Sequence, residues 1–216
     1  MTEPYQLTLG QMAQAIRAGD LTSEALVTSC LERISQVDPS ILAWASLNAK
    51  AALTRARQLD KESPRGLLHG IPIGVKDIID TDDFITSYNS PIYRTHQPTA
   101  NARIVKRALD AGAIVLGKTT TQEFATRGNV SPTRNPFSAL HTPGGSSSGS
   151  AAAVGANMVP LALSTQTAGS IVRPASYCGV VGFKAGYGLI DIAGVKRMSP
   201  TLDTLGVHTR NVQDAA

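Results

Sequence analysis

The chain has 216 residues, and 20 lysines and arginines against 16 aspartates and glutamates give it a formal net charge of +4. Hydrophobic residues make up 42% and charged residues 17%, which disfavours intrinsic disorder and suits a domain with a substantial core. Aromatic residues are only 5% and no run of basic residues concentrates the small positive excess, so we predict no nucleic-acid binding. The glycines gather beyond residue 110, which marks that part of the chain for closer inspection.

The number of cysteines and the hydropathy of the chain indicate the cellular compartment in which we expect the protein. The two cysteines, Cys30 and Cys178, are too few for a disulfide framework or a four-ligand zinc site. The first residues lack the basic start and apolar run of a signal peptide, and no window approaches the roughly 18 apolar residues of a membrane span. We therefore expect a cytoplasmic protein with no membrane association, no metal and no other cofactor.

The N-terminal third has the pattern of helices. Thr8 is placed to cap a stretch of helical spacing, and Gly19 stands where that helix would end. Thr22 or Ser23 begins a second helix. We expect it to end before Asp38-Pro39, because the residue before a proline avoids the helical conformation.

Two further elements complete this part of the chain. Residues 41–47 are apolar enough for a short strand, and residues 48–59 are rich in alanine and arginine and favour a helix. None of these elements carries obvious chemistry. We expect residues 1–65 to form a helical layer over a core of residues 66–216, both within one domain.

After Gly70 the sequence alternates between helical and strand-like segments. Such alternation, with fully apolar strands, is typical of a sheet that is covered on both faces. It predicts an α/β fold, a layered mixed β-sheet with helices on both faces. The predicted elements are a strand at 71–77 that carries Lys76 near its end, a helix at 101–111, a strand at 113–118, a helix at 150–157, and strands at 159–164 and 180–185.

Residues 142–150 are rich in glycine and serine and run directly into an alanine-rich helix. Such a run by itself is more often a flexible linker, but this continuation favours a tight loop that presents N–H groups at a helix N-terminus. A phosphate-binding P-loop would need a lysine that is absent here. Gly145-x-Ser147-x-Gly149 matches the nucleophile elbow of a Ser–His esterase, although a polar loop stands where that motif needs a strand.

A second loop follows the predicted strand at 159–164 and places Ser170 just beyond its end. The small residues Thr167, Ala168 and Gly169 let the backbone curl, so that successive N–H groups face one concavity. A developing oxyanion requires such an arrangement. The alternative is a plain turn whose serine caps the next helix, which is the commoner use of such a serine.

Together these segments resemble the amidase signature family. The likeness extends in order from about Gly66 to the end of the chain. The matching segments are the catalytic-lysine segment at 70–77, the Gly/Ser loop at 143–152, the nucleophile segment at 165–174 with the strand at 178–184, and scaffold positions at 112–118, 135–136 and 202–206.

The resemblance implies a hydrolase of amide (C–N) bonds that uses a Ser–Ser–Lys triad without histidine. Ser170 would be the nucleophile and would form an acyl-enzyme with the substrate carbonyl. Ser146, preceded by a cis peptide bond, would connect Ser170 to Lys76, the base, whose neutral form is favoured by burial. The oxyanion hole would consist of the backbone N–H groups of Thr167, Ala168, Gly169 and Ser170.

Departures from the family pattern refine this expectation. Ala168 stands where the commonest form has glycine, and Val172 stands where many members have arginine. The resulting arrangement resembles a stand-alone amidase branch more than the glutaminyl/glutamyl-tRNA amidotransferase subunit. Arg173 is suited to bind a substrate carboxylate through two hydrogen bonds, and a scaffold ion pair is the alternative. We expect a small-molecule amide as the substrate and keep a homodimer open.

The remaining candidates carry less chemistry. The four histidines are scattered without metal-ligand spacing, and Cys178 is predicted to be a buried filler. Lys118 and Lys184 flank strands and are predicted to lie at solvated edges.

The second hypothesis is a non-catalytic chain. Members of the family are longer than 216 residues, so the resemblance implies the N-terminal part of a longer protein whose fold is incomplete at the C-terminus. A truncated fragment, a split subunit or a pseudoenzyme would keep the triad without activity, and the Ser–His esterase stays a distant third hypothesis.

Overall fold

A six-stranded mixed sheet runs through the molecule in the order β1-β3-β2-β4-β6-β5. The computed structural model describes residues 2–126 and 128–216. The central strand β2 is parallel to both β3 and β4, whereas β1, β6 and β5 join as antiparallel strands. The strands are β1 (Trp44–Leu47), β2 (Pro72–Lys76), β3 (Ile114–Thr119), β4 (Leu161–Gln166), β5 (Val181–Lys184) and β6 (Thr204–Thr209).

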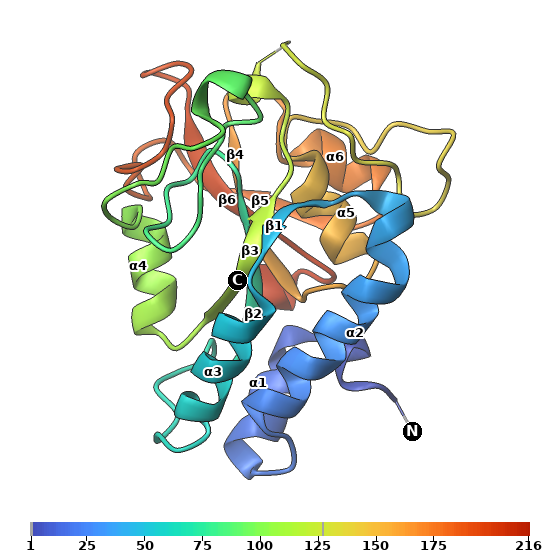
Figure 1. Cartoon of the computed structure of the whole chain (residues 1–216), viewed down its shortest axis with the longest axis vertical. Coiled ribbons are helices and arrows are strands. Elements are labelled where there is room, and N and C mark those ends of the chain that lie inside the picture. The colour runs from blue at the N-terminus through green and yellow to red at the C-terminus, as the bar shows by residue number, and fades with distance from the viewer. Residues whose placement is uncertain (1, 127) are drawn as a thin grey trace.

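Helices cover the sheet in layers, with α4 on one side and α5 and α6 on the other (Figure 1). This confirms the predicted α/β fold with a mixed sheet. Within the described ranges, none of the helices combines the length and apolar character that crossing a membrane requires. The helices are α1 (Leu9–Ala18), α2 (Ser23–Ile41), α3 (Ala49–Leu59), α4 (Arg103–Asp110), α5 (Ser148–Gly155) and α6 (Val172–Tyr177), with short 3-10 turns at Pro4–Gln6, Pro91–Tyr93, Glu123–Ala125 and Gln213–Ala215.

The predicted helix boundaries at the N-terminus are largely confirmed. The Thr8 hydroxyl accepts the Gln11 N–H at the start of α1, and Gly19 ends the helix in the left-handed conformation with φ 80°. Thr22 caps α2 in the same way, through the N–H of Ala25.

The predicted end of α2 is wrong, because the helix continues through Pro39 to Ile41. Pro39 lies in the last turn, where the missing N–H removes only one intrahelical bond. Two hydrogen bonds from the next residues hold Asp38 in the helical conformation. Its carbonyl accepts the Leu42 N–H at 2.7 Å, and its carboxylate accepts the Ala43 N–H at 2.7 Å.

Small side chains bring α5 close to the sheet, and this places the Gly/Ser loop against the strand ends. Ala151, Ala152 and Ala153 of this helix are fully buried. A side chain at Gly149 would collide with the carbonyl of Ala43, so glycine is required at this position. The strands β2, β3 and β4 below are buried at every residue.

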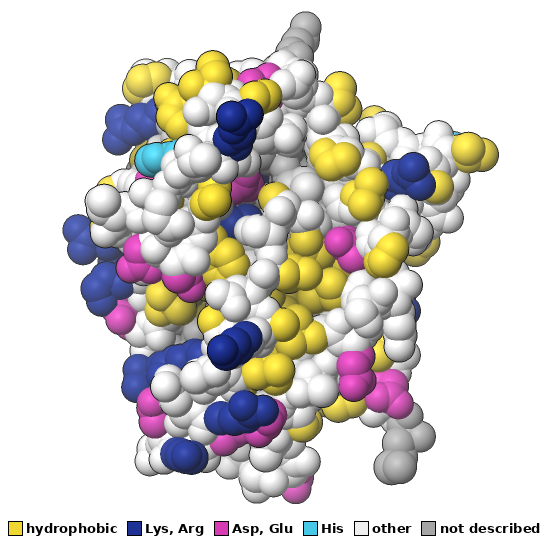
Figure 2. Space-filling model, viewed as in Figure 1, with side chains coloured by type: hydrophobic (Ala, Val, Ile, Leu, Met, Phe, Trp, Pro, Cys, Tyr) yellow, Lys and Arg dark blue, Asp and Glu magenta, His cyan; other side chains and the backbone are white. Residues whose placement is uncertain are grey.

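Charged side chains are distributed over the surface. On the face seen in Figure 2, lysine and arginine side chains are interspersed with acidic ones, mostly along one side and the lower part of the molecule. This agrees with the absence of a basic run in the sequence.

Candidate active site

Lys76 ends the central strand β2 and is fully buried. Its Nζ lies 2.8 Å from Ser146 Oγ, 2.9 Å from Thr165 Oγ1 and 3.5 Å from the Thr165 carbonyl oxygen. Burial lowers the pKa of Lys76 from 10.5 to about 7, and the negative charge of Asp203 partly opposes this shift. The lysine therefore reaches its neutral form near neutral pH.

The three contacts of Lys76 are compatible with both protonation states of its amine. An ammonium can donate its three N–H groups to the three oxygens. A neutral amine has two N–H groups and one lone pair, so it can donate to the two oxygens of Thr165 and accept the Ser146 hydroxyl. Among the described residues, no carboxylate lies within ion-pairing distance of Nζ, so the arrangement can accept a proton from Ser146.

The Gly/Ser run is a fixed loop rather than a linker. The peptide bond between Gly145 and Ser146 is cis, as the family resemblance implied. The Ser146 carbonyl accepts the Thr121 hydroxyl at 3.0 Å and the Gln122 N–H at 3.2 Å. The Ser148 hydroxyl donates to the carbonyl of Gly144 at 2.8 Å, which closes the loop at its other side.

Ser147 does not have the environment of a nucleophile elbow. Its hydroxyl is buried and donates to the Thr165 carbonyl at 3.3 Å. The residues directly before it form bends and irregular loop rather than the strand that the elbow motif requires. The Ser–His esterase interpretation therefore has no support in the geometry of this loop.

Ser170 lies on the turn after β4 and is largely buried. Its carbonyl accepts the Ser147 N–H at 3.3 Å, so the two loops are joined through the backbone. Within the described part of the chain, no side chain or backbone group makes a hydrogen bond to Ser170 Oγ. The structure thus joins Lys76 directly to Ser146, and it leaves the Ser170 hydroxyl without a partner.

The turn from Thr167 to Ser170 leaves backbone donors unused. Within residues 2–126 and 128–216, no acceptor lies within hydrogen-bonding distance of the N–H groups of these four residues. Ala168 is exposed and does not have positive φ, so replacing the usual glycine introduces no backbone strain here. Four consecutive free donors at a strand end are suited to binding an oxyanion.

Two residues that contact this site were not predicted from the sequence. Thr165 supplies two of the three contacts of Lys76. Asp203 accepts the Thr167 hydroxyl together with the N–H groups of Met198 and Ser199, so it fixes one end of the turn. Asp203 lies just before β6, a strand that the hydropathy pattern did not predict.

Lys118 was predicted to lie at a solvated edge, and that prediction is wrong. The side chain is fully buried, with Nζ 2.5 Å from the Ile79 carbonyl, 2.6 Å from Thr86 Oγ1 and 3.8 Å from the Asp77 carboxylate. The loop that follows β2 folds over β3 and removes this lysine from water. Lys184, by contrast, is exposed as predicted and donates to the Ala185 carbonyl.

Arg173 and Cys178 flank the site without joining it. Arg173 is exposed, and no acidic partner lies within ion-pairing distance of it among the described residues. Cys178 is buried as predicted, and burial raises the pKa of its thiol to about 12, which makes it a poor nucleophile at neutral pH.

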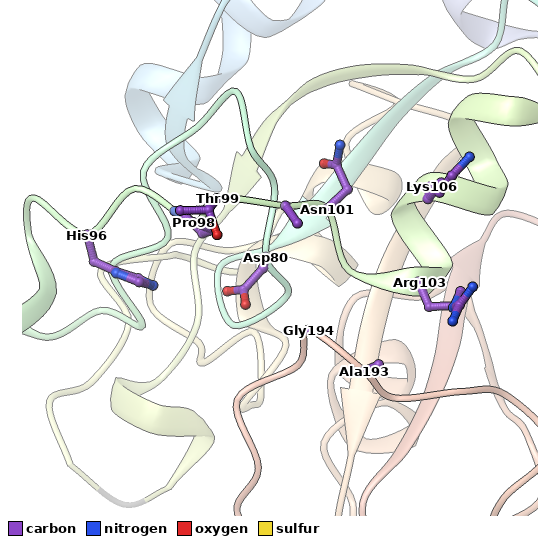
Figure 3. A pocket seen from close by; sticks show the side chains of 10 residues that line it. Asp80, His96, Pro98, Thr99, Asn101, Arg103, Lys106, Ala193 and Gly194 are labelled. Carbon is purple, nitrogen blue, oxygen red and sulfur yellow. The ribbon is translucent and has the colours of Figure 1, made fainter.

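A separate cavity of about 460 Å³ opens beside α4 (Figure 3). Asp80, His96 and the basic residues Arg103 and Lys106 line it, and none of the three triad candidates does. Both basic side chains already have acidic partners, Asp191 for Arg103 and Asp110 for Lys106. In the ranges that the structure describes, no group of three or more His, Cys, Asp or Glu side chains is arranged to hold a metal.

Comparisons with known proteins identify relatives of the chain. The family model described as Amidase matches residues 25–216. A glutamyl-tRNA(Gln) amidotransferase subunit of Chloroflexus aggregans is 40% identical and matches 100% of this chain and 46% of its own length. The corresponding subunit of Natranaerobius thermophilus is 39% identical over 98% of this chain and 45% of its own length. The chain therefore spans about half the length of the curated relatives that it matches.

Solved structures give the same result. The native peptide amidase from Stenotrophomonas maltophilia superposes with a TM-score of 0.94 at 39% identity, over 100% of this chain and 47% of that protein. The corresponding glutamyl-tRNA(Gln) amidotransferase subunit from Thermotoga maritima superposes with a TM-score of 0.86 at 36% identity, over 100% of this chain and 46% of that protein.

Proposed function

The chain belongs to the amidase family, and we propose that it hydrolyses amide C–N bonds through an acyl-enzyme formed on Ser170. The observation that carries this proposal is the contact of 2.8 Å between Lys76 Nζ and Ser146 Oγ. It lies in a fully buried site where the pKa of the lysine falls to about 7. Because the chain spans about half of its relatives, the activity of the whole protein is part of the proposal.

The proposed reaction moves one proton along the triad in each direction. Ser170 Oγ attacks the carbonyl carbon while its proton passes to Ser146, and the Ser146 proton passes to the neutral amine of Lys76. The tetrahedral intermediate then expels the amine, which takes a proton back along the same route as the C–N bond breaks. Water repeats the sequence on the ester and releases a carboxylic acid and free Ser170.

The oxyanion would be bound by the turn before the nucleophile. The backbone N–H groups of Thr167, Ala168, Gly169 and Ser170 have no acceptor among the described residues, which supports this role. Donors that are already oriented need no rearrangement when charge develops on the carbonyl oxygen. Removing one such donor in other enzymes lowers kcat about 10²- to 10³-fold.

The proposed substrate is a small-molecule amide. Arg173 is exposed and without an acidic partner among the described residues, which supports a role in binding a substrate carboxylate. Identities of 39% to a peptide amidase and 40% to an amidotransferase subunit do not distinguish the two branches. The turn sequence around Ala168 favours the stand-alone branch. The two buried, unpaired cysteines support a cytoplasmic location.

The alternative is a chain that keeps the triad but lacks activity. It is favoured by one observation, the coverage of only 45–47% of the length of these relatives. Such a chain would hold Lys76 and Ser146 in place without a complete substrate site.

Covalent labelling with a fluorophosphonate probe tests the proposal. Ser170 Oγ should displace fluoride from phosphorus, and mass spectrometry should place the adduct on the peptide that contains Ser170. Labelling should vanish in Ser170→Ala and persist in the matched control Ser147→Ala, which removes a buried hydroxyl of the neighbouring Gly/Ser loop. A folded protein that stays unlabelled would favour the non-catalytic alternative, and labelling lost only in Ser147→Ala would favour the esterase.

A further inference from the structure

Both peptide groups of Ile171, the residue after Ser170, are held by side chains, and the Ile171 carbonyl also accepts the Ala175 N–H at 3.1 Å. The Ile171 N–H donates to Gln166 Oε1 at 2.8 Å, and the Val172 N–H donates to the same oxygen at 3.0 Å. On the other side, Nε2 of His208 lies 3.0 Å from the Ile171 carbonyl oxygen. The backbone that carries the proposed nucleophile is therefore fixed from two directions, although the Ser170 hydroxyl itself has no partner among the described residues.

The contacts of His208 determine its tautomer. A carbonyl oxygen can only accept, so Nε2 must carry the hydrogen that is donated to Ile171. Nδ1 then has a lone pair, which accepts the hydroxyl of Ser164 at 2.8 Å. His208 thereby connects β6, where it lies, to Ser164 on β4 and to the turn beyond the end of β4.

His208 is fully buried and makes these contacts as a neutral ring. Burial lowers its pKa to about 4; the hydrogen bond to the Ile171 carbonyl opposes this shift, and the charged form of Lys76 adds to it. The ring therefore stays uncharged at neutral pH and does not compete with Lys76 for the proton. It has no access to substrate, so it acts only through the backbone that it holds.

We infer that His208 is a positioning residue for the acyl-transfer site: its Nε2–H holds the Ile171 carbonyl and thereby sets the place of Ser170 and of the free N–H groups before it. This inference rests on the proposed function. Histidine in this place was not predicted from the sequence, because the four histidines have no spacing that suggests a shared role.

Three variants separate positioning from simple stabilisation. His208→Leu removes the donor to Ile171 and the acceptor for Ser164. His208→Gln keeps an N–H donor, and Ser164→Ala removes only the second contact. Each variant is compared with the unchanged chain in fluorophosphonate labelling, resolved into the maximal rate kinact and the half-saturating concentration KI, and in hydrogen exchange of the backbone N–H groups of Ile171 and Val172.

The expected result is a selective loss of rate. In His208→Leu, kinact should fall about 10- to 100-fold with little change in KI, because a misplacement of about 1 Å is enough for such an effect. The same variant should exchange the Ile171 and Val172 hydrogens faster. His208→Gln should recover most of the rate, and Ser164→Ala should stay within about threefold of the unchanged chain even where it lowers stability.

Two outcomes overturn separate parts of the account. Equal kinact and equal exchange in His208→Leu and the unchanged chain would overturn the role of His208. If the unchanged chain is not labelled at Ser170, the proposed function fails. The exchange of Ile171 and Val172 then decides by itself whether His208 holds the turn.

Discussion

Two fully buried lysines occupy neighbouring strands and face opposite sides of the sheet. The register pairs Lys76 of β2 with Thr119, and Val75 with Lys118 of β3, so the two side chains point in opposite directions. Among the described residues, the hydrogen-bond partners of Lys76 Nζ are the Ser146 hydroxyl and the hydroxyl and carbonyl oxygens of Thr165. Lys118 lies 3.8 Å from the Asp77 carboxylate and contacts the loop that covers it.

Burial alone therefore does not decide what a lysine does in this fold. Desolvation lowers the pKa of both residues, to about 7 for Lys76 and about 8 for Lys118. For Lys118 the nearby aspartates, Asp77 first, oppose the shift and favour the charged form. Lys118 is thus suited to holding a loop as a cation, and Lys76 is suited to exchanging a proton with a serine.

The largest effect on stability is expected when Lys118 is replaced. Lys118→Met should lower the free energy of unfolding by about 3–5 kcal/mol, because it leaves the Asp77 carboxylate buried without its cation. Chemical denaturation at neutral pH measures this loss. The double variant with Asp77→Asn should recover part of it, and a single-variant loss below about 1 kcal/mol would show that the pair does not hold the loop.

Replacing Lys76 should have the opposite effect on stability. Lys76→Met should abolish labelling of Ser170, yet raise the free energy of unfolding at pH 7 by about 1–3 kcal/mol, because a desolvated amine is removed. The folded pKa of about 7 lies below the ordinary 10.5, so the unfolded state binds more protons between these values, and the stability of the unchanged chain rises with pH across them.

Chemical denaturation of the unchanged chain and of Lys76→Met at pH 7 and pH 10 therefore tests the direction in which stability changes with pH. The difference in free energy of unfolding between Lys76→Met and the unchanged chain should become smaller as pH rises. An advantage that grows with pH, or a variant that is several kcal/mol less stable, would contradict the assignment of Lys76 as a desolvated base.

A smaller effect is expected for the residue that orients the lysine. Thr165→Val keeps the shape of the side chain and removes the hydroxyl that lies 2.9 Å from Lys76 Nζ. The loss of one hydrogen bond should slow labelling of Ser170 about 3- to 10-fold without abolishing it. An unchanged labelling rate would mean that Ser146 alone is enough to orient the amine.

The smallest effect is expected for an exposed lysine on the same sheet. Lys184→Met should change the free energy of unfolding by less than about 0.5 kcal/mol and leave labelling unchanged, since Lys184 is exposed and its Nζ donates to the adjacent Ala185 carbonyl. Lys184→Met serves as the matched control for Lys118→Met. If both variants lose a similar free energy of unfolding, burial of Lys118 does not explain its contribution to stability.

Much of the fold could be predicted because it depends on local patterns. Caps such as Thr8 and the apolar run that becomes β3 are properties of neighbouring residues. The site residues Lys76 and Ser146 were identified through motif order, and the structure places their side chains in contact. β6 was not predicted, because its alternation is short and interrupted by Gly206 and His208.

The supporting residues could not be predicted, because their roles arise from contacts between distant segments. Lys118 has the local pattern of a strand end, and only the fold of the loop after β2 shows that it is buried. His208 meets Ile171 across 37 positions of sequence, and Asp203 meets Thr167 across 36. Such pairs leave no periodic signal in a single sequence.

The pH dependence of Ser170 labelling shows whether Lys76 acts as the base. If Lys76 is the base, the labelling rate should rise with pH along a single ionisation near 7, because only the neutral amine can take the proton from Ser146. Labelling is measured between about pH 5.5 and pH 9, a range that brackets this ionisation, with the adduct located on Ser170. A rate that does not change with pH over this range, or one that is still rising without a plateau at about pH 9, would contradict the assignment of Lys76 as a base with a pKa of about 7.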